Sequence, residues 1–123
     1  MTKRAISYQL WIALRRPLSI EVGRFGLLDF PAGVYVYTGS AKRNLDARIA
    51  RHARKKEALH WHIDYLLAAS GVELVCVGRS LRSECALNRA TGGDILIPGF
   101  GASDCRKGCG SHLRYLGPRR KGA

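Results

Sequence analysis

Residues 31–56 read PAGVYVYTGSAKRNLDARIARHARKK, and this stretch decides how the rest of the chain is arranged. It predicts a β-strand, a tight turn and a basic α-helix, in that order. Because strand side chains alternate between two faces, Tyr35 and Tyr37 share one face and the intervening valines the other. Thr38-Gly39-Ser40 has the composition of a turn, in which Gly39 is free to take a backbone conformation that other residues resist.

The second half of this stretch predicts an amphipathic helix that begins after Asn44, a suitable N-cap. Leu45 and Ile49 are four residues apart and start an apolar stripe that faces the core. Arg48 and His52 have the same spacing, so they stack along one edge of that stripe. The remaining basic side chains are expected to face solvent: Arg51, Arg54 and Lys55. A guanidinium and an imidazole that face phenols across a crevice would suit the handling of a phosphate.

The composition indicates a single globular domain with a polyanionic partner. A length of 123 residues supports one domain, and 46% hydrophobic residues are too many for a disordered chain. We expect residues 1–116 to form this domain and residues 117–123 to be a flexible basic tail. The 21 Lys and Arg exceed the 9 Asp and Glu, which gives a net charge of +12. Nucleic acid is the commonest partner of such a chain, although charge alone also fits a merely basic or ribosome-associated protein.

The apolar runs of the chain are too short to cross a membrane, since a span needs roughly 20 residues. Near the N-terminus Gln9 interrupts the apolar run, and no small-residue cleavage site follows it. We therefore expect a cytoplasmic protein with no membrane partner. Its four cysteines should then be reduced thiols or metal ligands rather than disulfides.

The remaining residues predict a mostly antiparallel sheet flanked by helices, within a small α/β fold. Alternation predicts strands over residues 5–14 and 18–22, joined as a hairpin by Arg15-Arg16-Pro17. Loops are expected at residues 23–26 and 29–33. The later elements are expected in this order: a helix over 60–70, a strand over 72–77, a helix capped by Ser80 that runs to about residue 91, an ordered glycine-rich loop over 95–110 and a short strand over 111–116.

Several phrases of the sequence resemble the GIY-YIG nuclease superfamily, and in particular its small stand-alone Uri-type endonuclease branch. They extend along nearly the whole chain: GVYVYTGSA at 33–41, HWHIDYL at 60–66, SEC at 83–85, GFGASDC at 99–105 and GSHL at 110–113. Tyr37-Thr38-Gly39 matches the second motif of the superfamily, with Thr in place of Ile. The superfamily places its two motifs on adjacent strands, so Ile6-Ser7-Tyr8 is the better match to the first motif, although its glycine is missing here.

The resemblance implies a metal-dependent hydrolysis of phosphodiesters. Glu84 would hold one divalent ion, Mg²⁺ or Mn²⁺, at the scissile phosphate. Tyr8 or Tyr37 would activate the attacking water, and Arg48 would stabilise the charge of the transition state. His52 would act as a base partner or a phosphate ligand. A tyrosine has a pKa of about 10, so it needs a nearby cation to act as a base, and the resemblance assigns that field to Arg48 and the metal.

Each of these residues also has a purely structural interpretation. Strand tyrosines are commonly packing residues with a polar tip. Arg48 is explained equally well as a solvated helix charge, and Glu84 as a first-turn acid that the helix dipole stabilises. The late asparagine of the superfamily is not obvious in this sequence, and Asn88, one helical turn beyond Glu84, is a candidate for it. For these residues, the resemblance is what favours catalysis.

Basic residues flank the proposed site and suit contacts to the DNA backbone, which position a substrate without reading its sequence. The candidates are Lys42, Arg43, Arg51, Lys55 and His62. His60, His62 and Asp64 do not have the spacing of a shared metal site, because helix neighbours are three or four residues apart. RNA is not excluded as a substrate, and the oligomeric state is open.

The cysteines leave two interpretations open. Cys85, Cys105, Cys109 and His112 carry suitable donor atoms for a structural zinc, although their spacing is not that of a standard zinc knuckle. Alternatively, buried thiols and a loop histidine order the glycine-rich segment, where Asp104 and His112 would also line the active cleft.

The sequence therefore predicts a metal-dependent endonuclease that cuts DNA, selects structure or single strands, and has a role in DNA repair. Two alternatives remain open. The first is a non-catalytic basic nucleic-acid-binding module, and the second is a zinc-stabilised interaction domain.

Overall fold

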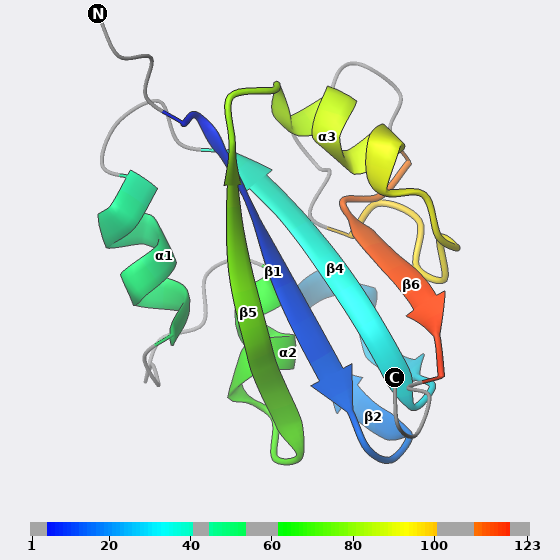
Figure 1. Cartoon of the computed structure of the whole chain (residues 1–123). Helices are drawn as coiled ribbons and strands as arrows, with labels where there is room; N and C mark the ends of the chain where they lie inside the picture. The colour runs from blue at the N-terminus through cyan, green and yellow to red at the C-terminus, as the bar shows by residue number, and fades with distance from the viewer. Residues whose placement is uncertain (1–4, 41–44, 54–61, 101–109, 119–123) are drawn as a thin grey trace, which may run out of the picture.

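A four-stranded antiparallel sheet in the order β5-β1-β4-β6 forms the centre of the protein (Figure 1). The computed structural model describes residues 5–40, 45–53, 62–100 and 110–118. The strands of the sheet are β1 (Ser7–Leu14), β4 (Gly33–Ser40), β5 (Val72–Ser80) and β6 (Leu113–Gly117). A second, two-stranded sheet pairs β2 (Leu18–Glu21) with β3 (Leu27–Phe30). The helices are α1 (Leu45–Ala53), α2 (His62–Ala68), α3 (Glu84–Thr91) and a short 3-10 turn over Gly23–Phe25. The predicted small α/β fold is thus confirmed.

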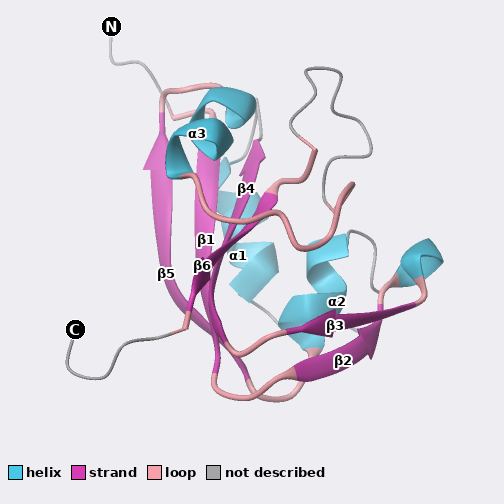
Figure 2. Cartoon of the chain, turned by 90° about the vertical axis from the view of Figure 1, so that its right-hand side faces the viewer, coloured by secondary structure: helices cyan, strands magenta, loops and turns pink. Residues whose placement is uncertain are grey.

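Layers lie on both faces of the central sheet. Figure 2 shows α1, α2 and the small sheet together on one side of the strands. Tyr8 of β1 contacts His52 of α1 on that side, whereas the next residue, Gln9, bonds to Thr91 of α3 on the opposite side. Because strand side chains alternate, these contacts place α1 and α3 on opposite faces.

The core fills the space between the sheet and the face covered by α1 and α2. The predicted alternation of β1 is confirmed, because Tyr8, Leu10, Ile12 and Leu14 are all buried. Ile49 of α1 joins them, as its stripe predicted, and α2 contributes Ile63 and Leu66. Burial of this apolar surface holds α1 and α2 against the sheet.

The predicted hairpin between residues 5–14 and 18–22 is wrong. β1 pairs along its length with β4 on one side and with β5 on the other, so neither edge is left for β2. β2 pairs instead with β3, in the register Leu18↔Phe30. The loop expected at 29–33 is therefore partly strand, because Asp29 and Phe30 belong to β3.

The predicted turn at Thr38-Gly39-Ser40 is also wrong, since β4 continues through Ser40. Similarly, β5 continues to Ser80, so α3 is capped by Ser83 rather than Ser80. The Ser83 hydroxyl accepts a hydrogen bond from the backbone N–H of Ala86 at 3.3 Å. The remaining helices and strands lie near their predicted ranges, although Gly117, predicted to begin the basic tail, is the last residue of β6. The Asn44 cap, residues 101–109 of the predicted glycine-rich loop and residues 119–123 of the tail fall outside the described residues. No helix in the described part of the chain is long and apolar enough to cross a membrane.

Candidate active site

The topology brings three strand ends and a helix N-terminus together at the upper end of the sheet in Figure 1. Ser7, which begins β1, lies opposite Ser40 at the end of β4 and opposite Ser80 at the end of β5. The chain then passes from Ser80 to Glu84, the first residue of α3. Tyr8, Ser40 and Glu84 are far apart in sequence, and the antiparallel register gathers them at one place.

Gly39 is required at this end of the sheet because the ring of Tyr8 lies directly over it. Gly39 is the cross-strand partner of Tyr8 in the pairing of β1 with β4. A Cβ atom at Gly39 would lie 2.5 Å from both Cζ and the hydroxyl oxygen of Tyr8. The glycine therefore serves close packing within a strand, and not the turn conformation that its neighbours suggested.

A hydrogen bond joins the predicted tyrosine and histidine. The hydroxyl of Tyr8 lies 2.8 Å from Nε2 of His52, and both side chains are buried. The centroid of the Tyr37 ring lies 6.5 Å from the centroid of the Tyr8 ring and 6.2 Å from that of the His52 ring. The structure therefore brings the two predicted tyrosines and His52 into one cluster.

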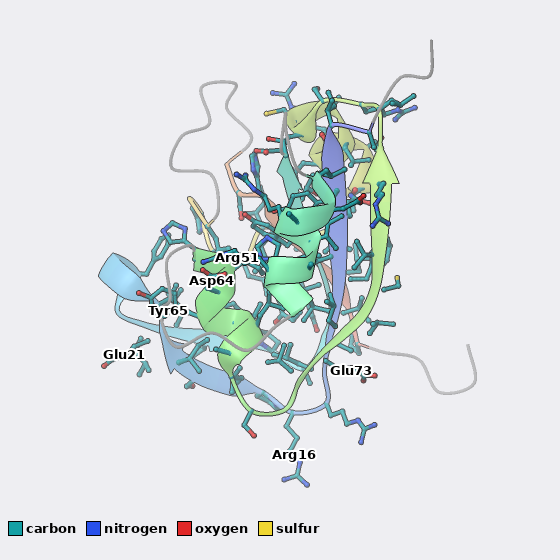
Figure 3. The ribbon with its side chains drawn as sticks, turned by 90° about the vertical axis from the view of Figure 1, so that its left-hand side faces the viewer. Arg16, Glu21, Arg51, Asp64, Tyr65 and Glu73 are labelled. Carbon is teal, nitrogen blue, oxygen red and sulfur yellow. The ribbon has the colours of Figure 1, made fainter. Side chains whose placement is uncertain are left out.

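Asp64 of α2 completes this cluster and was missed as a functional residue. Its Oδ1 lies 3.9 Å from Nδ1 of His52, on the side of the imidazole away from Tyr8. Its two carboxylate oxygens accept hydrogen bonds from Nη1 and Nη2 of Arg51 at 3.3 and 3.2 Å (Figure 3). The expectation that Arg51 simply faces solvent is wrong, because α2 packs beside α1 and its buried carboxylate needs a cation. The signal in the sequence is an acidic residue directly after Ile63, on a helix that contributes Ile63 and Leu66 to the core.

Arg48 anchors α1 to the end of β4 through a hydrogen bond from Nη1 to the carbonyl oxygen of Ser40 at 2.8 Å. Its charge lies close enough to oppose the pKa rise of Tyr8 and Tyr37 and to lower the pKa of Glu84. Arg48 thus lies beside the phenols and the carboxylate, as its predicted role requires.

Glu84 projects from the first turn of α3 toward His112, which directly precedes β6. Oε1 of Glu84 lies 2.6 Å from Nδ1 of His112, and 25% of the glutamate side chain is exposed, so solvent reaches it. Burial alone would raise the pKa of Glu84. Hydrogen bonds from His112 and Ser40 and the charges of His112 and Arg48 outweigh that effect and hold the pKa below its usual range. Glu84 is therefore ionised at neutral pH, and His112 lines the site as expected.

The charge of Arg48 alone does not bring the pKa of the tyrosines down to the range that a base requires, and the predicted joint action of Arg48 and a metal stays a prediction. Burial raises the pKa of Tyr8 and Tyr37 well above the usual value, and the opposing charge of Arg48 does not offset it. Desolvation wins because these phenols are packed between the sheet and α1. Both are neutral at physiological pH, so a proton acceptor such as His52 is needed if Tyr8 is to act as a base.

The other predicted site residues lie in different surroundings. The ring of His62 packs edge-on against that of Phe25, with their centroids 4.7 Å apart. Its centroid lies 5.5 Å from that of the Phe100 ring. Burial in this aromatic cluster lowers the pKa of His62. Asn88 is buried and donates to the carbonyl oxygen of Ser111 at 2.8 Å, which ties α3 to the segment before β6. Lys42, Arg43, Lys55, Cys105 and Cys109 lie outside the described residues.

The donor atoms at the site fit a hard divalent ion better than zinc. Among the described residues, no three His, Cys, Asp or Glu side chains gather as a metal-ligand group. Mg²⁺ commonly keeps several waters and takes only one or two carboxylates, which a partly exposed, ionised Glu84 can supply. Zinc sites need at least three protein ligands, and of the four predicted ones only Cys85 and His112 are described, with His112 directed at Glu84. The zinc prediction stays a prediction.

Comparison with known proteins gives one match. The model of a family described as "Domain of unknown function DUF123" matches residues 7–122 of this chain. No curated protein and no solved structure gives a significant match.

Proposed function

We propose, for a chain that belongs to the DUF123 domain family, the activity of a GIY-YIG-type endonuclease that hydrolyses phosphodiester bonds in DNA with Mg²⁺ or Mn²⁺. One observation carries the proposal, namely the meeting of Tyr8, His52, Arg48 and Glu84 at one end of the sheet. A cation, an ionised carboxylate and a phenol–imidazole pair at one place are the groups that hydrolysis of a phosphodiester requires. The resemblance to the GIY-YIG superfamily supports the same assignment.

Tyr8 and His52 together supply the base. The phenol oxygen of Tyr8 accepts a proton from the attacking water, while the phenol proton passes to Nε2 of His52 across their 2.8 Å hydrogen bond. The water oxygen forms a bond to phosphorus, and the bond from phosphorus to the leaving sugar oxygen breaks. That oxygen takes a proton from solvent, which leaves a phosphate monoester and a hydroxyl end.

Arg48 and Glu84 complete the site from the other two sides. Arg48 is held in place by Ser40, so its guanidinium is positioned for the non-bridging oxygens of the phosphate. Glu84 would hold Mg²⁺ or Mn²⁺, which when bound supplies positive charge that stabilises the leaving oxygen. His112 orients the Glu84 carboxylate through its Nδ1.

The charge of the chain supports nucleic acid as the substrate. A net charge of +12 favours binding to a phosphate backbone without sequence preference. In the sequence, Lys42 and Arg43 follow β4, and Lys55 follows α1. We propose that these three residues contact the DNA backbone. Arg51 is engaged by Asp64, so we do not assign it such a contact. We expect cleavage of single-stranded or branched DNA, which would suit a role in DNA repair.

The test compares two variants with the same chemical change. Glu84→Gln removes the proposed metal ligand, whereas Glu73→Gln removes an exposed carboxylate near the opposite end of the sheet, where Glu73 pairs with Ala13. Labelled single-stranded, duplex and branched DNA are incubated with Mg²⁺, with Mn²⁺ and with chelator. We expect cleavage by the wild type and by Glu73→Gln, and a loss of about 100-fold or more in Glu84→Gln. If no substrate is cut, or if Glu84→Gln cuts as well as wild type, the proposal fails.

The burial of the cluster favours a second candidate, a non-catalytic nucleic-acid-binding module. Tyr8, Tyr37 and His52 are each less than 10% exposed, as expected for a packed polar core. This candidate predicts salt-sensitive DNA binding that is indifferent to chelator and leads to no cleavage. The same assays, repeated as binding measurements, separate it from the nuclease.

A further inference from the structure

A chain of buried polar groups runs from the candidate site into the interface between α1 and α2. It begins at the Tyr8 hydroxyl, passes through both ring nitrogens of His52 and reaches the carboxylate of Asp64. The side chains of His52 and Asp64 are 0% exposed, and Arg51 binds both oxygens of the carboxylate with 28% of its side chain exposed. The proposed hydrolysis assigns no role to Asp64 or Arg51.

Asp64 is placed to influence which ring nitrogen of His52 carries the proton. A neutral imidazole has one N–H, and the other nitrogen carries a lone pair. A carboxylate 3.9 Å from Nδ1 attracts the N–H to that side electrostatically. The lone pair is then on Nε2, where the Tyr8 hydroxyl can donate to it at 2.8 Å. With the opposite tautomer Nε2 would be a donor and could not accept the phenol proton.

We propose that Asp64 is a positioning residue that holds His52 in the Nδ1–H tautomer, so that Nε2 accepts the proton of Tyr8 during cleavage. The catalytic part of this inference rests on the proposed nuclease function. In this arrangement the proton moves from Tyr8 to His52 and not the other way. The Asp64 carboxylate stabilises the imidazolium that results.

Arg51 gives Asp64 its orientation. Two parallel hydrogen bonds from one guanidinium fix the plane of a carboxylate, which a single contact does not. Other charged or titratable groups also surround His52, and they are Tyr8 from β1, Tyr37 from β4, Asp64 from α2, and Arg48 and Arg51 from α1. Asp64 is the anion whose oxygen lies 3.9 Å from Nδ1, so its replacement is the sharpest perturbation of the tautomer.

The first experiment measures the tautomer directly, in the free protein and without any substrate. The ¹⁵N chemical shifts of His52 are recorded at a pH where the imidazole is neutral. In the wild type we expect a protonated Nδ1 and an unprotonated Nε2. In Asp64→Asn we expect a mixture of the two tautomers, or a protonated Nε2 and an unprotonated Nδ1. The reason is that an amide presents either an oxygen or an NH₂ group to Nδ1. A wild-type His52 with an unprotonated Nδ1 would overturn the inference even if the variant does not fold.

The second experiment measures cleavage, with Asp46→Asn as the matched control. Asp46 also forms an ion pair with an arginine, Arg79, but it lies exposed on α1. We expect Asp64→Asn to lower kcat by about 100-fold or more with little change in KM for DNA, because wrong-tautomer variants lose turnover rather than binding. Asp46→Asn should behave as wild type.

The outcomes separate this inference from the proposed function. Cleavage by the wild type with unchanged kcat and tautomer in Asp64→Asn overturns the role of Asp64 and leaves the nuclease standing. Absence of cleavage in the wild type, with an Asp64-dependent tautomer, refutes the nuclease and retains Asp64 as the group that sets His52. An equal loss of kcat in Asp46→Asn would overturn the assignment to Asp64, because any lost ion pair on α1 would then suffice.

Discussion

The hydroxyl end of the Tyr8 ring lies close against Gly39, and this contact helps to fix the phenol where it meets His52. Gly39 therefore controls the position of the proposed base without touching the substrate. The role of this glycine was not predictable from its flanking residues, because Thr-Gly-Ser is equally typical of a turn. Only the cross-strand register of Tyr8 with Gly39 reveals it.

Gly39→Ala is expected to destabilise the fold and displace Tyr8. A methyl group 2.5 Å from the phenol cannot be accommodated unless the ring moves. The expected cost is about 1–3 kcal/mol of unfolding free energy, the range of overpacked cores, together with loss of cleavage. Urea denaturation measures it. Gly78→Ala is the control, because Gly78 also lies in a strand and a Cβ atom there meets nothing within 4 Å. Equal stability of the two variants would contradict this account of Gly39.

Among the elements of the described residues, local patterns predicted the three α-helices and five of the six strands, but they missed β3 and placed ends and strand partners poorly. The alternation of β1 and the stripe of α1 are local properties of the sequence, and both were confirmed. The exclusion of β2 from the edge of β1 is not local, because it depends on β4 and β5 arriving later in the chain to occupy both edges of β1. The N-cap of α3 was misplaced for a related reason. Ser80 and Ser83 are both suitable caps, and only the pairing of Ser80 with Ser7 assigns Ser80 to a strand.

Ser83→Ala is expected to loosen the first turn of α3, where Glu84 lies. The Ser83 hydroxyl accepts from the N–H of Ala86, and loss of such a cap costs about 1 kcal/mol. Cleavage should fall as well, because Glu84 is the residue that follows the cap. Urea denaturation and the cleavage assay measure both effects. Ser70→Ala, at an exposed position just after α2, is the control and should change neither. If Ser83→Ala is as stable as the wild type, the hydrogen bond from Ala86 to Ser83 does not contribute to the free energy of unfolding.

At the scale of the whole molecule, the candidate site exists only because the sheet brings distant segments to one end. The sequence supplied most of its members through the resemblance, namely Tyr8, Tyr37, Arg48, His52 and Glu84. It did not supply Asp64, whose neighbours come from α1 and are invisible to spacing within α2. Nor did it supply the raised pKa of the phenols, because burial depends on packing of the finished fold.

That burial makes the fold sensitive to alkali in a way that can be measured. The pKa values of Tyr8, Tyr35 and Tyr37 are raised, first of all by desolvation. Below the ordinary tyrosine pKa of 10.0 both the folded and the unfolded chain keep these protons, so stability is unaffected. Above it the unfolded chain releases them and the folded chain does not, so the free energy of unfolding decreases as pH rises.

We therefore expect the phenolate absorbance of these three tyrosines to rise together with the loss of circular dichroism. Tyr8→Phe should make the dependence of stability on pH less steep above pH 10, because one proton fewer is released on unfolding. The measurement is urea denaturation at a series of alkaline pH values. Reversible ionisation of all tyrosines while the circular dichroism stays native would show that the phenols are not held in a dry core. Tyr8 would then be a more accessible base than its contacts with Gly39 and His52 indicate.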